Sequence, residues 1–271
     1  MRVLVVIPSL NEEKPLPGVL AELRDAARAL PHQLEYLVID DGSHDGTAAV
    51  ARNSGARVIV LCSNLGIGGA VQTGLRVAFA EGFDCAAQID GDGQHSAADL
   101  GALLEKLPDA DLVLGSRFLR SGGFQSTVLR RAGKHWLARV LRIVCGLSVT
   151  DPTSGFRVFG PRALALFQRV FPFDFPEPES LAVARSCGLH IVEMPVTMRE
   201  RQAGHSSIRG LLSAWYVLKV TAAIILGLLR TRRQAPALEP SWNRSSAATG
   251  SSLSSASASP PPSSASSRGS T

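Results

Sequence analysis

Two aspartates that stand two positions apart are the residues of this sequence best suited to hold a metal ion. Asp90 and Asp92 lie in the run DGDGQH at positions 90–95. A loop of this kind turns both carboxylates toward one centre, and Gln94 offers a third oxygen. Oxygen ligands that leave coordination positions open suit Mg²⁺ or Mn²⁺ shared with a diphosphate. A plain acidic turn is the simpler alternative, whereas an EF-hand loop needs glycine at its sixth position, where His95 stands.

The first half of the chain alternates short apolar runs with amphipathic stretches, which is typical of a parallel sheet covered by helices on both faces. The predicted strands are residues 2–7, 35–39, 57–61, 85–89 and 111–114, and the predicted helices lie near 16–30, 45–54, 68–81 and 97–107. Ligands of such sheets bind beyond the carboxyl ends of the strands. The residues that directly follow each strand are therefore expected to form the site.

Those residues are unusually polar. They include Pro-Ser-Leu-Asn-Glu at 8–12, Asp-Asp-Gly-Ser at 40–43, the DGDGQH run and Gly-Ser-Arg at 115–117. Up to five carboxylates and one arginine would gather at a single edge of the sheet. Because crowded carboxylates repel one another, we expect a divalent cation among them. The glycines of 64–71 open a helix, and we expect them to let its start approach the sheet or a nucleotide closely.

The balance of charge differs between the two halves of the chain. Residues 1–116 carry 8 basic and 16 acidic side chains, whereas residues 117–271 carry 20 basic and 7 acidic ones. An anionic partner is therefore expected at the second half. With 45% hydrophobic and 19% charged residues, the chain of 271 residues can bury a core, which excludes a coiled coil or a wholly disordered chain. Four widely spaced cysteines fit a reducing, cytosolic setting.

Five motifs, in the same order, resemble glycosyltransferase family 2 and, more closely, its dolichol-phosphate mannosyltransferase-like group. They lie at 8–12, 40–47, 65–70, 90–95 and 115–118. The likeness covers about residues 2–209 and implies a GT-A fold, an inverting active site and a single nucleotide-sugar-binding α/β domain. We therefore expect a GT-A domain over 1–209, with a mostly parallel sheet flanked by helices. An apolar helix at 210–233 and a disordered Ser/Ala/Pro tail at 234–271 are expected to follow.

The resemblance also implies roles for individual residues. Those that would hold the donor are Pro8, Leu10, Glu12, Ile39, Asp41, Asp90, Gly91, Asp92, Arg117 and Arg201. Asp90, Asp92 and Gln94 would bind Mg²⁺ or Mn²⁺. Arg117 would lie on the phosphates, where a guanidinium pairs with two oxygens, although a surface salt bridge is its plain alternative.

Two later segments match the same group. The run DPTSGFR at 151–157 is expected to form part of the acceptor side or, more simply, a tight turn. The segment 199–207 resembles a loop that closes over donor phosphates. Arg201 matches the arginine of that loop, although Ser207 stands where the group usually has lysine. A QxxRW string, typical of processive members, does not occur, which favours a single transfer.

The need for a general base depends on the acceptor. A hydroxyl loses its proton during attack, whereas a lipid phosphate is already anionic at neutral pH. Glu177 and Glu179 are the candidate bases, but they also suit the first turn of a helix that runs to about Cys187. Asp92, Arg117 and Arg201, which would stabilise the departing diphosphate, complete the expected catalytic set.

The second half also has features that suit a membrane surface. Seven basic residues and no acid lie between 117 and 142, and this stretch is expected to meet acceptor phosphate or anionic headgroups, unless it is a solvated helix face. Residues 211–229 are apolar except for Ser213, Lys219 and Thr221. Because Lys219 disfavours a membrane span, an interfacial helix is expected, with a buried core helix as the alternative.

Together these observations predict an inverting, metal-dependent, non-processive glycosyltransferase. It would move one sugar from a nucleotide-sugar donor to a polyprenyl phosphate at the cytoplasmic face of a membrane, as a peripheral or single-helix-anchored protein. One alternative is transfer to a saccharide hydroxyl in cell-surface polysaccharide assembly, and another is a non-catalytic nucleotide-sugar-binding subunit. Nucleic acid is not an expected partner, because neither a helix-turn-helix nor an aromatic stacking platform is evident.

Overall fold

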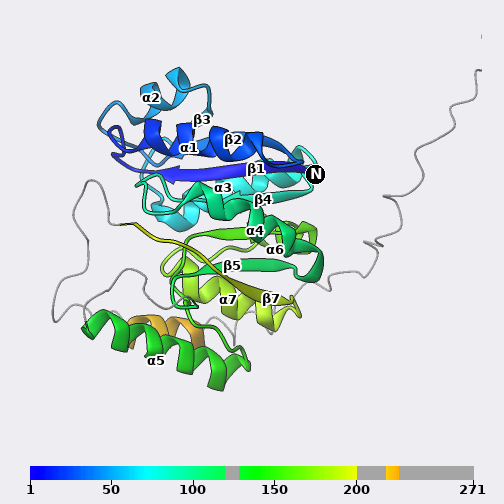
Figure 1. Cartoon of the computed structure of the whole chain (residues 1–271). Helices are drawn as coiled ribbons and strands as arrows, with labels where there is room; N and C mark the ends of the chain where they lie inside the picture. The colour runs from blue at the N-terminus through cyan, green and yellow to red at the C-terminus, as the bar shows by residue number, and fades with distance from the viewer. Residues whose placement is uncertain (120–127, 200–217, 226–271) are drawn as a thin grey trace, which may run out of the picture. The chain divides into compact units, whose positions relative to one another are not determined.

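A seven-stranded sheet organises the chain in the computed structural model, which describes residues 1–119, 128–199 and 218–225 (Figure 1). The strands are β1 (Arg2–Ser9), β2 (Gln33–Asp40), β3 (Arg57–Val60), β4 (Cys85–Gln88), β5 (Leu112–Ser116), β6 (Arg157–Phe159) and β7 (Ile191–Pro195). The helices are α1 (Leu16–Arg28), α2 (Thr47–Asn53), α3 (Gly66–Ala80), α4 (Leu100–Glu105), α5 (Val128–Cys145), α6 (Pro161–Phe167) and α7 (Pro176–Ser186). Short 3₁₀ turns lie at Ala97–Asp99 and Leu107–Asp109.

The strand order is β3-β2-β1-β4-β6-β5-β7. Neighbouring strands are parallel except where β6 pairs antiparallel with β4 and β5. The predicted α/β architecture with a mostly parallel sheet is therefore confirmed, including all five predicted strands. The chain runs from β1 to β2 and β3 on one side and then returns to β4 on the other side of β1. This switch of direction is where open α/β sheets place their ligands.

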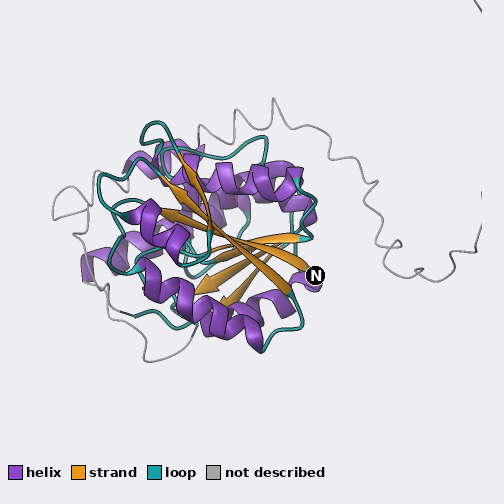
Figure 2. Ribbon diagram, turned by 90° about the horizontal axis from the view of Figure 1, so that it is seen from above, coloured by secondary structure: helices purple, strands orange, loops and turns teal. Residues whose placement is uncertain are grey.

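Helices cover both faces of the sheet, as Figure 2 shows from above. Alternate residues of β1 face different cores. Val3, Val5 and Ile7 pack with the α1 and α4 side, whereas Leu4 and Val6 pack with the α3, α6 and α7 side. Because β1 is buried on both faces, its sequence is a continuous apolar run rather than an alternating one.

Helix α5 packs with the short helix formed by residues 218–225, which lies beside it in Figure 1. Val220 and Ile224 are buried in the same apolar cluster as Leu137. The Trp136 indole Nε1–H donates a hydrogen bond to Thr221 Oγ1, 3.1 Å away. Within the described ranges, no helix combines the length and the apolar character needed to cross a bilayer. The other residues of the predicted apolar helix, the 200–207 part of the loop and the predicted tail lie outside the described residues.

Candidate active site

A cavity of about 500 Å³ opens where β1, β2 and β4 end and α3 begins. Four carboxylates line it, from Glu12, Asp41, Asp90 and Asp92. The other lining residues are Pro8, Ser9, Leu10, Asn11, Asn64, Gly66, Ile67, Ala70 and Gly91. Four of the five expected motifs therefore meet at one edge of the sheet, whereas the Gly-Ser-Arg motif at 115–117 contributes nothing to the lining. The volume suits a small-molecule ligand.

Side chains of the first two motifs hold the wall of this cavity together. Asn11 adopts a left-handed backbone with φ of 56°, which asparagine tolerates better than most residues. Its Oδ1 accepts a hydrogen bond from the His44 N–H at 2.9 Å, and its own N–H donates to Ser43 Oγ at 2.9 Å. Asp41 Oδ1 accepts from the Leu65 N–H at 2.7 Å, so the second motif is fixed to the start of α3.

Asp90 and Asp92 reach the cavity from the loop that follows β4. Asp92 is buried, and its Oδ1 accepts a hydrogen bond from the Gln94 N–H at 3.0 Å. Asp90 is held on another side by His95, whose Nδ1 accepts from the Asp90 N–H at 3.3 Å and whose Nε2 lies 3.9 Å from Asp90 Oδ2. The imidazole is itself buried and stacks on Phe156, with ring centroids 5.2 Å apart.

Gly155 lies directly against the Asp90 carboxylate. A Cβ at this position would stand 2.7 Å from Asp90 Oδ2 and 2.9 Å from Oδ1, so only glycine allows so close an approach. This contact explains why the DPTSGFR run, which comes from a distant part of the sequence, belongs to the site. It packs against the aspartate that the first half supplies.

The donor set fits a metal ion that is shared with a ligand better than a closed protein cage. Asp90 Oδ1 is a buried oxygen without a hydrogen-bond partner among the described residues. Within those same residues, no group of three His, Cys, Asp or Glu side chains is placed to hold a metal ion alone. Two carboxylates completed by phosphate oxygens are the usual arrangement for Mg²⁺.

Three of the predicted donor or metal residues do not line the cavity. Ile39 is fully buried in the core. Gln94 donates from its side-chain amide to the Arg199 carbonyl at 3.4 Å. Arg117 forms an ion pair with Asp151, so two nitrogens of its guanidinium already have carboxylate partners. Arg201 lies outside the described residues.

Comparison with known proteins agrees with this geometry. The model of glycosyl transferase family 2 matches residues 4–167, more than half of the chain and every strand from β1 to β6. The chain belongs to this family. It is therefore a glycosyltransferase, and the five motifs that suggested the family all lie within the matched range.

Two curated relatives share most of their length with this family 2 chain. The undecaprenyl-phosphate mannosyltransferase of Micrococcus luteus is 34% identical over 231 residues, which cover 82% of this chain and 93% of that protein. The polyprenol monophosphomannose synthase of Mycolicibacterium smegmatis is 30% identical over 223 residues, which cover 77% of this chain and 82% of that protein. The chain is thus similar to these enzymes over more than three quarters of its length.

A solved structure shares the fold. Glucosyl-3-phosphoglycerate synthase from Mycobacterium tuberculosis, crystallised with Mn²⁺, UDP and glucosyl-3-phosphoglycerate, superposes with a TM-score of 0.59 at 23% identity. The match covers 84% of this chain and 79% of that one. The expected GT-A fold of this glycosyltransferase is therefore confirmed.

The candidate bases lie on α7, which begins and ends close to the predicted bounds. Burial raises the pKa of Glu177, although the nearby positive charge of Arg157 opposes this effect. Burial also raises the pKa of Glu179 to about 7, and Asp174 adds to the shift. Neither carboxylate lines the large cavity.

The sequence interpretation gave no individual role to Arg157, the last residue of the DPTSGFR run. Its guanidinium is almost fully buried and donates to the Ser154 carbonyl at 2.8 Å, to Ser180 Oγ at 2.6 Å and to the Glu177 carbonyl at 2.8 Å. Burial lowers the pKa of Arg157 to about 10, while Glu177, Asp151 and Asp90 act in the opposite direction. A charged residue directly after the Ser-Gly-Phe turn was the only sign of it in the sequence.

Proposed function

We propose that this glycosyltransferase moves a single mannose, with inversion, from a nucleotide-sugar donor to a polyprenyl phosphate in a metal-dependent reaction. The observation that carries the proposal is the cavity lined by Asp90 and Asp92 in a chain of this family. The names of the two curated relatives support the sugar and the acceptor. Inversion rests on the family resemblance, and transfer of one sugar rests on the missing QxxRW string.

The nucleotide of the donor would occupy the part of the cavity between Leu10, Asp41 and Ile67. One oxygen of Asp41 is fixed by the Leu65 N–H, so the carboxylate is oriented before the ligand arrives. A carboxylate held in this way can accept a hydrogen bond from a ribose or base without first losing side-chain freedom. Asp41 would therefore orient the nucleoside.

Asp90 and Asp92 would hold the divalent cation, either Mg²⁺ or Mn²⁺. A bound cation would offset the negative charge that builds up on the departing diphosphate. The protein prepares its side of this site in two ways. His95 accepts from the Asp90 backbone N–H and lies 3.9 Å from its carboxylate, for which Gly155 leaves room. The Gln94 N–H fixes Asp92. Gln94 as a further ligand, and Arg201 as a phosphate-binding residue, remain predictions.

A phosphate acceptor would attack without help from a base, because its oxygen is already anionic. Transfer to a saccharide hydroxyl is the second candidate function, and it would need a general base. The raised pKa of Glu179, about 7, suits that role, although Glu179 does not line the cavity. The substitutions E177Q and E179Q separate the two, because loss of either carboxylate would abolish transfer only to a hydroxyl.

The acceptor would be reached from an anionic membrane surface through α5 and the 218–225 helix. These two helices contain no Asp or Glu, and they expose Trp136, Ile143, Leu218 and Ile225 at 52%, 76%, 60% and 43%. Exposed apolar side chains among basic residues are typical of helices that lie in a membrane interface. Peripheral attachment at the cytoplasmic face is the localisation that we propose.

Vesicle sedimentation tests this attachment. The full chain should sediment with vesicles that contain phosphatidylglycerol and much less with vesicles of phosphatidylcholine alone. The double substitution R139Q/R142Q on α5 should reduce binding to the anionic vesicles. The matched control R28Q/R52Q removes the same charge from α1 and α2 and should bind as the unaltered protein does. Equal binding of both variants would contradict this surface.

A transfer assay tests the proposed reaction. Membranes that contain the full chain are incubated with undecaprenyl phosphate and a panel of labelled GDP- and UDP-sugars, and label in the organic phase is counted. We expect label from a mannose donor, lost with EDTA, restored by Mn²⁺ and lost in D92N. If no donor labels a lipid, the acceptor is wrong. If D92N is fully active, the assigned metal site is wrong.

A further inference from the structure

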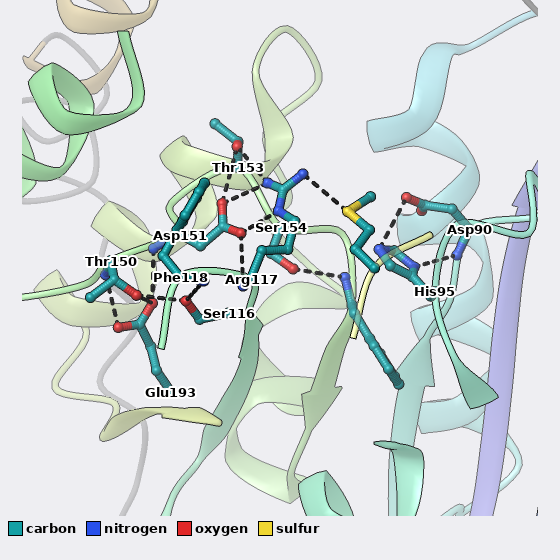
Figure 3. Close-up of polar contacts among 12 residues, drawn as sticks. Asp90, His95, Ser116, Arg117, Phe118, Thr150, Asp151, Thr153, Ser154 and Glu193 are labelled. Carbon is teal, nitrogen blue, oxygen red and sulfur yellow. Dashed lines mark hydrogen bonds and ion pairs between the residues drawn. The ribbon is translucent and has the colours of Figure 1, made fainter. Parts of the chain in front are cut away.

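Arg117 follows β5 and forms an ion pair with Asp151, a fully buried aspartate. Asp151 is 0% exposed, and its two oxygens accept from Arg117 Nε at 2.5 Å and from Nη2 at 2.6 Å (Figure 3). The Arg117 backbone N–H donates to the same carboxylate at 3.3 Å. Two parallel hydrogen bonds of this kind fix both the position and the plane of a guanidinium.

Asp151 is itself held from the opposite side by β7. Its N–H donates to Glu193 Oε1 at 3.0 Å, and the Thr150 N–H donates to both Glu193 oxygens at 2.9 and 2.8 Å. The Ser116 and Thr150 hydroxyls are 2.6 Å apart, which joins the end of β5 to the same turn. Arg117 is therefore held by a scaffold that includes two neighbouring strands.

The third nitrogen of the guanidinium, Nη1, has a weaker hydrogen-bond partner than Nε and Nη2 have. Arg117 Nη2 also donates to Thr153 Oγ1 at 3.1 Å, whereas Nη1 lies 3.3 Å from the sulfur of Met198. A thioether is a poor hydrogen-bond acceptor, so a phosphate oxygen can replace it at little cost. Met198 pairs with His95, which contacts Asp90, and in Figure 3 Arg117 lies between Asp151 and the His95–Asp90 pair.

A second arginine–aspartate pair at the other end of β5 shows what a structural pair looks like. Arg162 Nη1 lies 2.8 Å from Asp111 Oδ2, and the Asp111 carboxylate also accepts a backbone N–H, from His190. The Arg162 side chain is 47% exposed, whereas that of Arg117 is 16% exposed. Burying an ion pair adds little to stability, so stability alone does not account for the buried pair beside the site.

We propose that Asp151 is a positioning residue, which holds Arg117 by Nε and Nη2 and directs Nη1 at a phosphate oxygen of a bound substrate. The inference rests on the proposed function, because it takes the substrates to carry phosphate. That phosphate belongs either to the diphosphate of the donor or to the acceptor. In both cases Arg117 donates one directed hydrogen bond to the phosphate rather than two, because Nε and Nη2 already donate to Asp151.

The substitution D151N tests the proposal, because it keeps the shape of the side chain and removes one acceptor and the charge. We expect the KM for one phosphate substrate to rise by about tenfold or more, with a smaller change in kcat. In an R117M background the same substitution should add almost nothing, because Arg117 is no longer there to be positioned. An equal effect of D151N with and without Arg117 would overturn the proposal.

Direct binding identifies which phosphate is contacted. Calorimetry on the full chain compares Mn²⁺ with UDP or GDP in one arm, and undecaprenyl phosphate in detergent micelles in the other. Weaker binding of D151N in the first arm assigns Arg117 to the donor, and in the second arm to the acceptor. Unchanged binding in both arms would overturn the proposal. These arms work even if no sugar transfer is found, so failure of the proposed function is distinguished from failure of this inference.

Two further variants guard against an effect of misfolding. D111N breaks the matched pair at the other end of β5 and should leave both KM values and both affinities unchanged. T153V removes the hydrogen bond from Nη2 and the one that the Thr153 hydroxyl donates to Asp151 Oδ1. It keeps the Arg117–Asp151 ion pair and should raise the same KM as D151N by about two- to threefold. If D151N does not fold, an unchanged KM in T153V would count against the proposal.

Discussion

At the end of the sheet where the parallel strands begin, acidic and basic side chains pair with one another at the surface. Arg57 lies 2.7 Å from Glu81 and 3.5 Å from Glu35, and Arg2 lies 3.3 Å from Glu35, with all four side chains between 40% and 46% exposed. At the end where those strands finish, the carboxylates of Asp41 and Asp92 are buried and accept hydrogen bonds from backbone N–H groups.

The protein thus uses charge for stability at one end of the sheet and for ligands at the other. Exposed pairs satisfy each other and leave nothing for a ligand. A buried carboxylate oxygen that lacks a partner among the described residues, such as Asp90 Oδ1, is unfavourable until a cation or donor arrives. The two ends should therefore respond in opposite ways to the same kind of substitution.

The largest effect is expected for D90N. Asparagine keeps the shape of the side chain but cannot hold a divalent cation as a carboxylate does, so transfer should fall by about 1000-fold or more. The melting temperature should stay level or rise, because a crowded negative charge is removed. E81Q, at the opposite end of the sheet, is the control and should keep full activity. Transfer by D90N within tenfold of the unaltered protein would contradict the role of Asp90 as a metal ligand.

Much of the fold followed from the sequence because the strands of the first half are strongly apolar. Strand β1 is buried on both faces, and such runs are hard to mistake. The two strands of the second half gave no such signal. Strand β6 has three residues and includes the buried Arg157, and β7 is half-buried and includes Glu193 and Pro195. Their place in the sheet is decided by tertiary packing rather than by local pattern.

The site, too, combines residues that the sequence predicts with contacts that only the folded structure shows. The residues that line the cavity come from motifs that directly follow strands, so the topology rule places them together without knowledge of side-chain contacts. The partner of Arg117 is 34 positions away in a turn, and periodicity cannot show such a pairing. Gly155 was recognised as a turn residue, but its contact with Asp90 depends on how β6 lies against β4.

A smaller effect is expected for G155A, which moves Asp90 without changing its charge. The added Cβ would stand 2.7 Å from Asp90 Oδ2, so the carboxylate must shift. A displacement of this size should lower transfer by about 10- to 100-fold and weaken Mn²⁺ binding in calorimetry. The control is G18A in α1, where a Cβ meets nothing within 4 Å. G18A should gain about 0.5 kcal/mol of stability and keep its activity. Equal activities of the two variants would contradict the role of Gly155.

The next effect concerns the pH dependence of stability through Glu179. Its pKa in the folded state is about 7, above the ordinary value of 4.5, so the folded protein binds a proton that the unfolded chain has already lost. Its contribution to stability is therefore full below pH 4.5 and is lost as the pH rises through about 7.

E179Q should remove this dependence. Near pH 4.5, below the shifted pKa, the variant and the unaltered protein should unfold at similar denaturant concentrations. At about pH 8, E179Q should be the more stable by about 1 kcal/mol, a figure reduced for the partial exposure of the side chain. Urea titrations at several pH values measure this difference. Parallel stability curves for the two proteins would show that Glu179 ionises normally in the fold.

The smallest effect is expected for R57Q at the end of the sheet where the strands begin. Arg57 pairs with Glu81 and Glu35, but all three side chains are more than a third exposed, so water and salt screen the attraction. The free energy of unfolding should fall by less than about 1 kcal/mol, and the loss should shrink further in about 0.5 M NaCl. Transfer activity should not change, because no residue of this cluster lines the cavity. A loss of several kcal/mol in the free energy of unfolding, independent of salt, would mean that this network behaves as a buried one. The two ends of the sheet would then differ only in that one of them holds the ligand site.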